Sequence, residues 1–262
     1  MIELVEDNFQ DGIDPYWVRF CTGHATIESG PGLARFVVDG AEQGHLSDAE
    51  IDDHRAVPRH KLPWTPPLRM SIRARMSHRA GEMLGTAGFG FWNDPFDWVG
   101  NVQVPPNALW FFYASPQSDM AFVPKIAGHG WKAAMLNAGR ADKLTMALGN
   151  FIFQLPGMSK LVFRAAQART DAAEIILNDA MLTDWRDYRI DWLENEARFF
   201  VDEVEVLRAP NPPRVPLGFV AWVDNNFAAM GPGREFAFGR MAISQRQWME
   251  LAHVKIERLP RA

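Results

Sequence analysis

The chain has 262 residues, of which 47% are hydrophobic and 23% charged, and its formal net charge is −5. This apolar content is enough for a sizeable core and excludes a disordered protein, and the acidic balance argues against a nucleic-acid-binding protein, which normally carries a basic stripe. Cys21 is the single cysteine, so an intrachain disulfide framework is excluded. No C-x-x-C or H-x-x-x-H spacing occurs, and we expect neither a metal nor a cofactor.

Residues 1–40 predict two or three strands, separated by the turn residues Gly30-Pro31-Gly32. The first residues, MIELVEDNFQDG, are acidic and lack the basic-then-apolar pattern of a secretory leader. We therefore expect a cytoplasmic location.

Residues 41–67 are polar and interrupted by prolines, which predicts a loop. It contains the cluster Asp52-Asp53-His54, whose side chains are of the kind that hold a cation. An exposed loop explains the same cluster more simply.

The segment Leu68 to Met76 alternates apolar and polar residues, which predicts a strand with one buried face. Arg73 and Arg75 lie on the other face. Two interpretations remain open for them: a solvated face, or the lining of a ligand-binding cleft.

Two aromatic strands are predicted next. Residues 87–94, AGFGFWND, contain glycines that allow close backbone approach, and residues 108–115, ALWFFYAS, are continuously apolar. The second strand is too hydrophobic for a solvated face.

Residues 124–182 predict a helical insertion. Leu144, Leu148, Phe151, Ile152 and Leu155 form one helical stripe that Pro156-Gly157 ends. A second helix is predicted over 159–168, and Asp171-x-x-Glu174 predicts a third that ends near Asn178. Three roles remain open for the insertion: ordinary packing on the domain, a lid over a cleft, or contact with a membrane surface through its apolar stripe and flanking basic residues.

The stretch 185–227 predicts three consecutive strands with clear turns: residues 188–192 alternate apolar and polar side chains, residues 198–201 are rich in aromatic and β-branched side chains, and the chain re-enters a sheet at 217–224 after a proline-rich turn. The order YRIDW, a turn, RFFVD and then NPPRVPLGFVAWV resembles the concanavalin A-like lectin/glucanase superfamily, and within it the laminarinase-type glycoside hydrolases. The resemblance implies a mainly β fold, a concanavalin A-like jelly-roll β-sandwich, forming a single domain over 1–262 with the helical insertion at 124–182.

In the hydrolases that the chain resembles, the strand after the "FW" strand carries alternating carboxylates on the concave face, one acting as nucleophile and one as acid/base. The matching strand here is apolar, and no carboxylate lies between Asp97 and Asp119. Two-carboxylate glycosidase chemistry therefore does not carry over, and we expect an apolar pocket floored by Leu109, Phe111 and Tyr113. A structural calcium is also common in the superfamily; Glu6 and Asp7 are the suggestive pair, and the site stays unassigned.

The resemblance places Trp222 and Asp224 toward the cleft. The predicted ligand-binding residues are Trp222, Trp92, Phe91, Leu109, Trp110, Phe111, Asn93, Asn225, Arg73 and Arg75. Asp224, Asp94 and Tyr113 are the acid/base candidates, since a carboxyl buried among aromatic rings keeps its proton near neutral pH. The alternatives are that Trp222 is a core residue, and that Asp94-Pro95 and Asp224-Asn225-Asn226 are turns.

Two main functions follow. The first is binding of a small, largely apolar molecule in the concave cleft, with an acid/base-assisted cyclisation or isomerisation. The second is a non-catalytic, lectin-like module that stacks a sugar on Trp222, Trp92 or Trp110. A protein bound to a membrane surface through 124–182 is a further alternative. The sequence does not indicate the oligomeric state.

Overall fold

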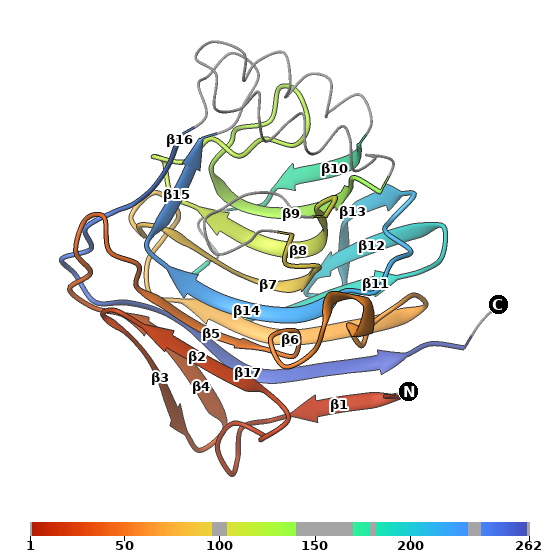
Figure 1. The fold of residues 1–262 in the computed structure, drawn as a ribbon, viewed down its shortest axis with the longest axis horizontal. Helices are drawn as coiled ribbons and strands as arrows, with labels where there is room; N and C mark the ends of the chain where they lie inside the picture. Colours follow the sequence, from red (N-terminus) through yellow and green to blue (C-terminus); the bar gives the residue numbers. More distant parts are fainter. Residues whose placement is uncertain (1, 96–103, 140–169, 179–181, 230–236, 261–262) are drawn as a thin grey trace.

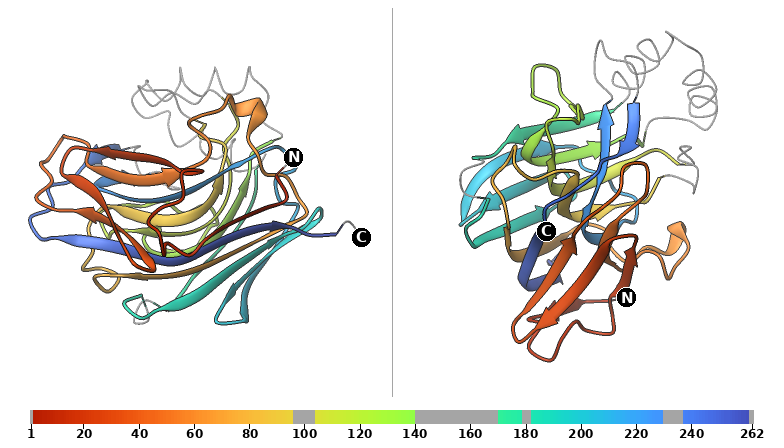
Figure 2. Two further views of the ribbon diagram at one scale, coloured as in Figure 1. Left: turned by 90° about the horizontal axis from the view of Figure 1, so that it is seen from below. Right: turned by 90° about the vertical axis from the view of Figure 1, so that its left-hand side faces the viewer.

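The computed structural model describes residues 2–95, 104–139, 170–178, 182–229 and 237–260 (Figure 1). These residues form two stacked antiparallel sheets with almost no helix, which confirms the predicted mainly β sandwich. Strands of the second sheet bow toward the first, so that the outer face of the second sheet is concave (Figure 2).

The first sheet, sheet A, has eight strands within the described residues. Its order is β13 (Val204–Pro210), β12 (Glu196–Val201), β11 (Arg186–Trp192), β6 (Leu68–Met76), β17 (Gln247–Arg258), β4 (Leu33–Val38) and β3 (Ala25–Gly30). The remaining strand, β1 (Leu4–Asp7), pairs with β17, so that the two ends of the chain lie near each other (Figure 1).

Sheet B has seven strands in the described part of the chain. Its order is β10 (Asp171–Ile176), β9 (Gly130–Asn137), β8 (Asn107–Ala114), β7 (Thr86–Trp92), β14 (Gly218–Asp224), β5 (Asp48–Asp52) and β2 (Val18–Thr22). A small hairpin, β15 (Asn226–Ala229) with β16 (Ala237–Arg240), and a short 3-10 helix, η1 (Arg59–Lys61), complete the described elements.

The core lies between the two sheets and follows from the period-2 alternation of side chains along each strand. On β6 the predicted apolar face, from Leu68 to Met76, is buried as expected. Sheet B contributes the inward residues of β7, β8 and β14, among which Phe89, Phe111 and Phe219 are fully buried. Two of these rings contact Tyr188 of sheet A: Phe89 edge-to-face with ring centroids 5.1 Å apart, and Phe111 in a tilted contact at 5.0 Å.

Two expectations for the N-terminal part need correction. Residues 1–40 contain four strands rather than two or three, although the turn at residues 30–32 separates β3 from β4 as predicted. Residues 48–52, expected in a loop, form β5 near one edge of sheet B. The segment is polar because its outward positions are all acidic, while Ala49 and Ile51 are buried in the core.

The range 124–182 is only partly an insertion. Residues 130–137 and 171–176 are strands β9 and β10 of sheet B, so the predicted helix beginning at Asp171 is wrong. A β-strand forms there because alternate side chains face opposite sides of sheet B: Ala173 packs on the core, while Glu174 forms an ion pair with Lys132 on the other face. The helices predicted over 144–155 and 159–168 lie outside the described residues. Among the described residues, no helix has the length and hydropathy needed to cross a bilayer.

Candidate functional site

The concave face of sheet B is built by the outward residues of β5, β14, β7 and β8. The strand register aligns them in rows: Glu50 stands opposite Trp222, which stands opposite Gly88, which stands opposite Phe112. Because side chains alternate along a strand, these residues share one face of the sheet.

Three tryptophans form a continuous surface on this face, which we call the tryptophan platform: Trp92, Trp110 and Trp222. The ring centroids of Trp92 and Trp110 are 6.3 Å apart, and those of Trp110 and Trp222 are 5.9 Å apart. All three residues are only partly buried. The indole nitrogens of Trp92 and Trp110 have no hydrogen-bond partner among the described residues, whereas Trp222 donates to the Thr86 hydroxyl at 2.9 Å.

Two glycines of β7 make room for the platform. A Cβ on Gly88 would lie 2.9 Å from the Trp222 ring, and a Cβ on Gly90 would lie 2.6 Å from the Trp110 Cα. The indole rings can therefore pack directly against the backbone of β7, because Gly88 and Gly90 have no side chain, as their small size predicts.

Four carboxyl groups lie beside the platform, and we call them the acidic row: Asp48, Glu50 and Asp52 of β5, and Asp224 of β14. Asp48 stands directly opposite Asp224 in the register, and Glu50 directly opposite Trp222. All four residues are at most 8% exposed. Three of the four come from a segment that the sequence predicted to be a loop.

One guanidinium serves two members of this row. Arg55 donates to Asp52 at 3.1 Å and to Glu50 at 3.2 Å, and its guanidinium carbon lies 4.0 Å from the Phe20 ring centroid. Asp52 also accepts backbone N–H groups of His54 and Arg55 at 3.0 and 2.8 Å. Asp52 is thus held firmly in place by the turn that follows β5.

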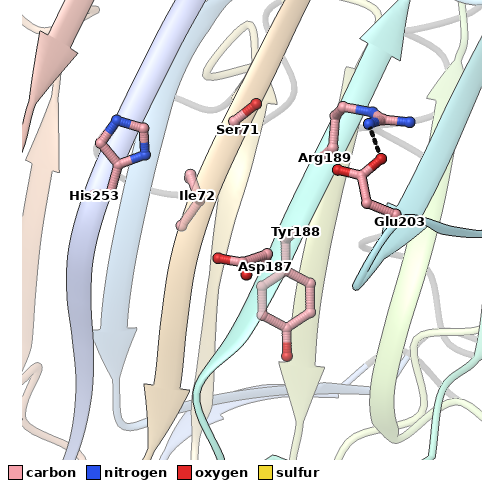
Figure 3. Close-up of a pocket in the computed structure, with 7 residues that line it drawn as sticks. All are labelled: Ser71, Ile72, Asp187, Tyr188, Arg189, Glu203 and His253. Carbon is pink, nitrogen blue, oxygen red and sulfur yellow. Dashed lines mark hydrogen bonds and ion pairs between the residues drawn. The ribbon is translucent and has the colours of Figure 1, made fainter.

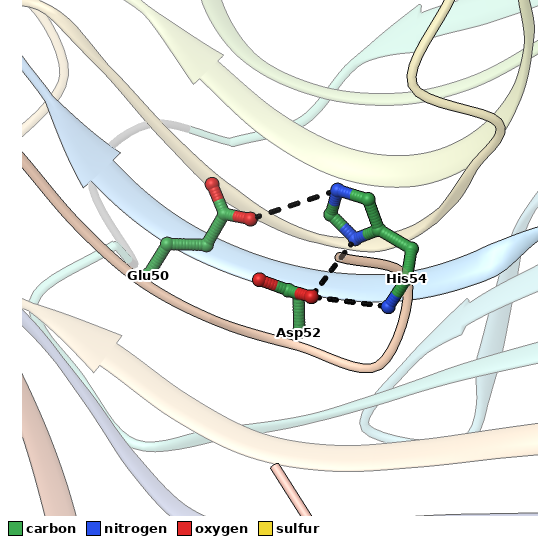
Figure 4. Close-up of side chains that lie close together, drawn as sticks. All are labelled: Glu50, Asp52 and His54. Atoms are coloured by element: carbon green, nitrogen blue, oxygen red, sulfur yellow. Dashed lines mark hydrogen bonds and ion pairs between the residues drawn. The ribbon is translucent and has the colours of Figure 1, made fainter. Parts of the chain in front are cut away.

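The His54 ring faces both Glu50 and Asp52, with one ring nitrogen directed toward each (Figure 4). Its Nδ1 is 3.4 Å from Asp52 and its Nε2 is 4.0 Å from Glu50. One oxygen of Glu50, one oxygen of Asp52 and one ring nitrogen of His54 lie within 4.8 Å of one another, a spacing at which these three side chains could hold a cation. Burial lowers the pKa of His54, which favours the neutral ring. The sequence cluster Asp52-Asp53-His54 is not one site, since Asp53 accepts hydrogen bonds from Trp64 at 2.6 Å and Tyr16 at 3.1 Å, and burial raises its pKa to about 7.

The two ends of the acidic row differ in their partners. Asp224 accepts hydrogen bonds from the backbone N–H and hydroxyl of Thr86 and from the backbone N–H and side-chain amide of Asn226. The side chain of Asp48 has no hydrogen-bond or ion-pair partner within the described residues, and its Oδ1 is buried. Burial, together with repulsion from Asp224, raises the pKa of Asp48 well above its usual range. Burial and the neighbouring Asp48 do the same for Glu50.

Four of the predicted site residues lie on this face as expected: Trp92, Trp110, Trp222 and Asp224. The alternative that Trp222 is an interior core residue is wrong, since it packs with Trp110 on the outer side of the sheet. Their role in binding stays a prediction.

The predicted apolar floor is wrong. Leu109, Phe111, Tyr113 and Phe91 are fully buried between the two sheets. The apolar strand β8 has hydrophobic residues on both faces, so alternation alone did not tell which face points inward. Tyr113 is not an exposed acid: its hydroxyl donates to the Met83 carbonyl at 2.7 Å and accepts from the Gly81 N–H at 2.9 Å.

Three further predicted residues have structural contacts. Asn93 binds the Pro105 carbonyl and the Asn107 N–H, which ties the ends of its loop together. Asn225 is fully buried and bonds two segments, residues 45–47 through His45 and Ser47, and the chain at Met241, so it does not line a rim. Asp94 is not buried among aromatic rings: its side chain is 40% exposed and lies 3.7 Å from Arg59. Asp97 lies outside the described residues.

Arg73 and Arg75 lie on the outer face of sheet A, on the far side of the core from the tryptophan platform. Arg73 pairs with Asp187 and Arg75 with Glu250. The interpretation of a cleft lining is wrong for both, because β6 belongs to sheet A. Asp7, considered for calcium, accepts hydrogen bonds from Phe9, Asp14 and Trp17, which fixes an N-terminal loop.

Two hollows occur elsewhere on the described surface. One, of about 60 Å³, lies on the outer face of sheet A beside Asp187, Arg189 and His253 (Figure 3). The other, of about 230 Å³, lies beside His78, Ile243 and Gln247. Neither hollow has a lining residue on the concave face. In the first, two of the lining residues, Arg189 and Glu203, form an ion pair with each other.

Solved structures with this architecture are numerous. A lichenase, a β-1,3-1,4-glucanase derived from a mouse hindgut metagenome, is 12% identical with a TM-score of 0.56, covering 98% of this chain and 100% of that one. The laminarinase catalytic domain of Thermotoga maritima is 11% identical with a TM-score of 0.53, covering 99% of each chain.

This is a concanavalin A-like glucanase fold. A Crh5 transglycosylase in complex with NAG shares it, with 12% identity, a TM-score of 0.55 and coverage of 100% of this chain and 86% of that one. No protein-family model matches this chain, and no curated protein matches its sequence. At these identities the likeness shows the fold alone. The chemistry of the face must be argued from its residues.

Proposed function

We propose that the concave face of sheet B binds a saccharide. The observation that carries the proposal is the tryptophan platform directly beside the acidic row on one face. A sugar ring has apolar C–H faces that stack on indole rings, and a rim of hydroxyl groups that donate to carboxylates. Within the described residues, Asp48 Oδ1, Glu50 Oε1 and the indole N–H groups of Trp92 and Trp110 accept or donate no hydrogen bond, which suits such a ligand.

The proposal draws support from the fold. The lichenase, laminarinase and transglycosylase with the same sandwich carry carbohydrate-active names, and one of them is described with bound NAG. The outward positions of β8 are Ala108, Trp110, Phe112 and Ala114, and Trp110 is the partly exposed one, so the strand expected to hold catalytic carboxylates contributes an indole surface instead.

A small, largely apolar molecule with an acid/base step is the second candidate. It is favoured by one observation, the burial of Asp48 and Glu50 beside Trp222, because a carboxyl with a raised pKa can deliver a proton. It is less well supported, because an apolar ligand would leave the acceptors of the acidic row without donors.

The test is isothermal titration with a panel of glucan, galactan and chitin oligosaccharides and, separately, apolar terpenoid and polyketide compounds. We expect binding by at least one saccharide, and a loss of about tenfold in affinity, or about 1.4 kcal/mol, for Trp222→Ala and for Trp110→Ala. Trp248→Ala is the matched control, since Trp248 is a partly buried tryptophan on the outer face of sheet A beside Arg35.

Two results would count against the proposal. If no saccharide binds while an apolar compound does, the second candidate replaces it. If Trp248→Ala weakens saccharide binding as much as Trp222→Ala, the ligand does not sit on the concave face.

A further inference from the structure

The charges beside the tryptophan platform do not balance. On β5, β14 and the turn of residues 53–55, the described residues direct four carboxyl groups, the acidic row, toward the concave face, against one guanidinium, Arg55. Arg55 is shared by Glu50 and Asp52. Asp224 is held by neutral donors, and Asp48 has no partner among the described residues. This part of the face has a surplus of acceptors that a positively charged ligand would satisfy.

The surplus lies next to the aromatic rings. Glu50 is the direct cross-strand neighbour of Trp222, and Asp48 follows one row further along β5. Tryptophan is the aromatic side chain that attracts a cation most strongly through its ring face. A ligand stacked on the platform and carrying an ammonium group at its edge would therefore meet both the indole and the carboxyl groups.

We propose that the saccharide bound on this face is an amino sugar with a free amine, its ring stacked on the tryptophan platform and its ammonium group against Glu50 and Asp48. This inference rests on the saccharide-binding function proposed above and names the substrate class. An N-acetylated sugar has a neutral amide in place of the ammonium and cannot offset the charge of the acidic row. A neutral glucan brings hydroxyl donors but no charge.

The neighbouring groups make the interaction dependent on pH. Asp48 faces Asp224 from β14, Asp52 and Arg55 from its own strand and turn, and the Cys21 thiol from β2. Glu50 faces Asp48, Asp52, Arg55 and His54. On β16, Arg240 stands opposite Asn226. Burial raises the pKa of Asp48 and Glu50, so an arriving ammonium group has to displace protons from them. Binding should release protons and strengthen as pH rises, as long as the amine stays charged.

The experiment compares four probes by isothermal titration on the full chain in mildly acidic buffer: a glucosamine tetramer, the N-acetylglucosamine tetramer, cellotetraose and choline. We expect the glucosamine tetramer to bind at least about tenfold more tightly than either neutral tetramer, with proton release that buffers of different ionisation enthalpy reveal. Salt should weaken this preference only slightly, because the carboxyls of the acidic row are buried and buried charges are screened less than exposed ones.

Two variants test the residues. In Asp48→Asn/Glu50→Gln we expect the preference for the glucosamine tetramer to fall to about the level of the neutral tetramers. Asp187→Asn removes a carboxylate from the outer face of sheet A, where it pairs with Arg73, and should leave the preference as in the unmodified protein. A thermal melt of each variant confirms that it folds.

The outcomes separate the two proposals. Equal affinities for charged and neutral tetramers would overturn the amino-sugar inference and leave saccharide binding standing. Choline binding as tightly as the glucosamine tetramer would also overturn it, since the face would then recognise an ammonium group without a sugar. If none of the tetramers and no other saccharide binds, both proposals fail.

Discussion

The outer faces of the two sheets both carry buried carboxyl groups and tryptophans, but they differ in how far arginines balance the charge of those carboxyls. On the outer face of sheet A, Glu250 is fully buried and accepts hydrogen bonds from Arg35 at 2.5 Å and Arg75 at 2.6 Å. Asp191 pairs with Arg69 there at 2.6 Å. On the concave face of sheet B, Arg55 pairs with two carboxyls of the acidic row, Glu50 and Asp52, and no arginine or lysine of the described residues forms an ion pair with Asp48 or Asp224.

The difference agrees with a structural role for the outer face of sheet A and with the binding role proposed for the concave face of sheet B. Paired charges on sheet A complete a self-contained network, in which Arg35 and Arg75 also cover the Trp248 ring. Unpaired buried carboxyls on sheet B weaken folding, and such groups persist mainly where function needs them. Three substitutions test this contrast.

The largest effect is expected from Glu250→Gln. Removing the charge leaves Arg35 and Arg75 without their shared carboxylate, and breaking a buried ion pair of this kind costs about 3 kcal/mol. Urea unfolding should show a lower midpoint with an unchanged slope. If stability changes by less than about 0.5 kcal/mol, the network on sheet A is not the stabilising one.

Gly88→Ala should have an intermediate effect, confined to the platform. The added Cβ would lie 2.5 Å from the Phe111 carbonyl oxygen and 2.9 Å from the Trp222 ring, so the strand or the indole must shift. We expect a loss of about 1–2 kcal/mol in stability and weaker ligand binding. Gly30→Ala on β3 is the control, because a Cβ there meets nothing within 4 Å. Equal melting temperatures for the two variants would contradict the packing argument.

The smallest effect, and one of opposite sign, is expected from Asp48→Asn. The pKa of Asp48 is raised in the folded protein, so the native state holds this proton more tightly than the unfolded state does. The contribution of Asp48 to stability is therefore complete below its unfolded pKa of about 3.8 and is lost as pH rises through the folded pKa.

Asparagine stays neutral throughout, so the variant should match the unmodified protein at low pH and exceed it by about 1 kcal/mol at high pH. Thermal melts across the pH range measure the difference. A variant that is less stable at every pH would mean that Asp48 has a stabilising partner and that the charge surplus is smaller than proposed.

Part of the candidate site could be predicted from the sequence. The alternation in 217–224 placed Trp222 and Asp224 on one face, and the glycines of 87–94 indicated a close approach to the backbone. The acidic row was missed because its strand has acids at every outward position and resembles a loop. The alternation Asp48-Ala49-Glu50-Ile51-Asp52 was the available signal.

The sequence by itself determined the strands β6 and β14 to within one residue and the absence of carboxylates on β8, because period-2 patterns and composition are local properties of the chain. The sandwich was implied by the resemblance of the motifs in 185–227 to the concanavalin A-like superfamily. The tertiary structure alone decided which face of β8 points inward, since both faces are apolar, and it buried Leu109, Phe111 and Tyr113. It also decided that Arg73 and Arg75 lie on the opposite side of the sandwich from Trp222. It further decided that Arg55 is the arginine that pairs with Glu50 and Asp52 beside Trp222. Sheet membership and charge balance depend on which strands pair across long sequence separations, and no local pattern records that.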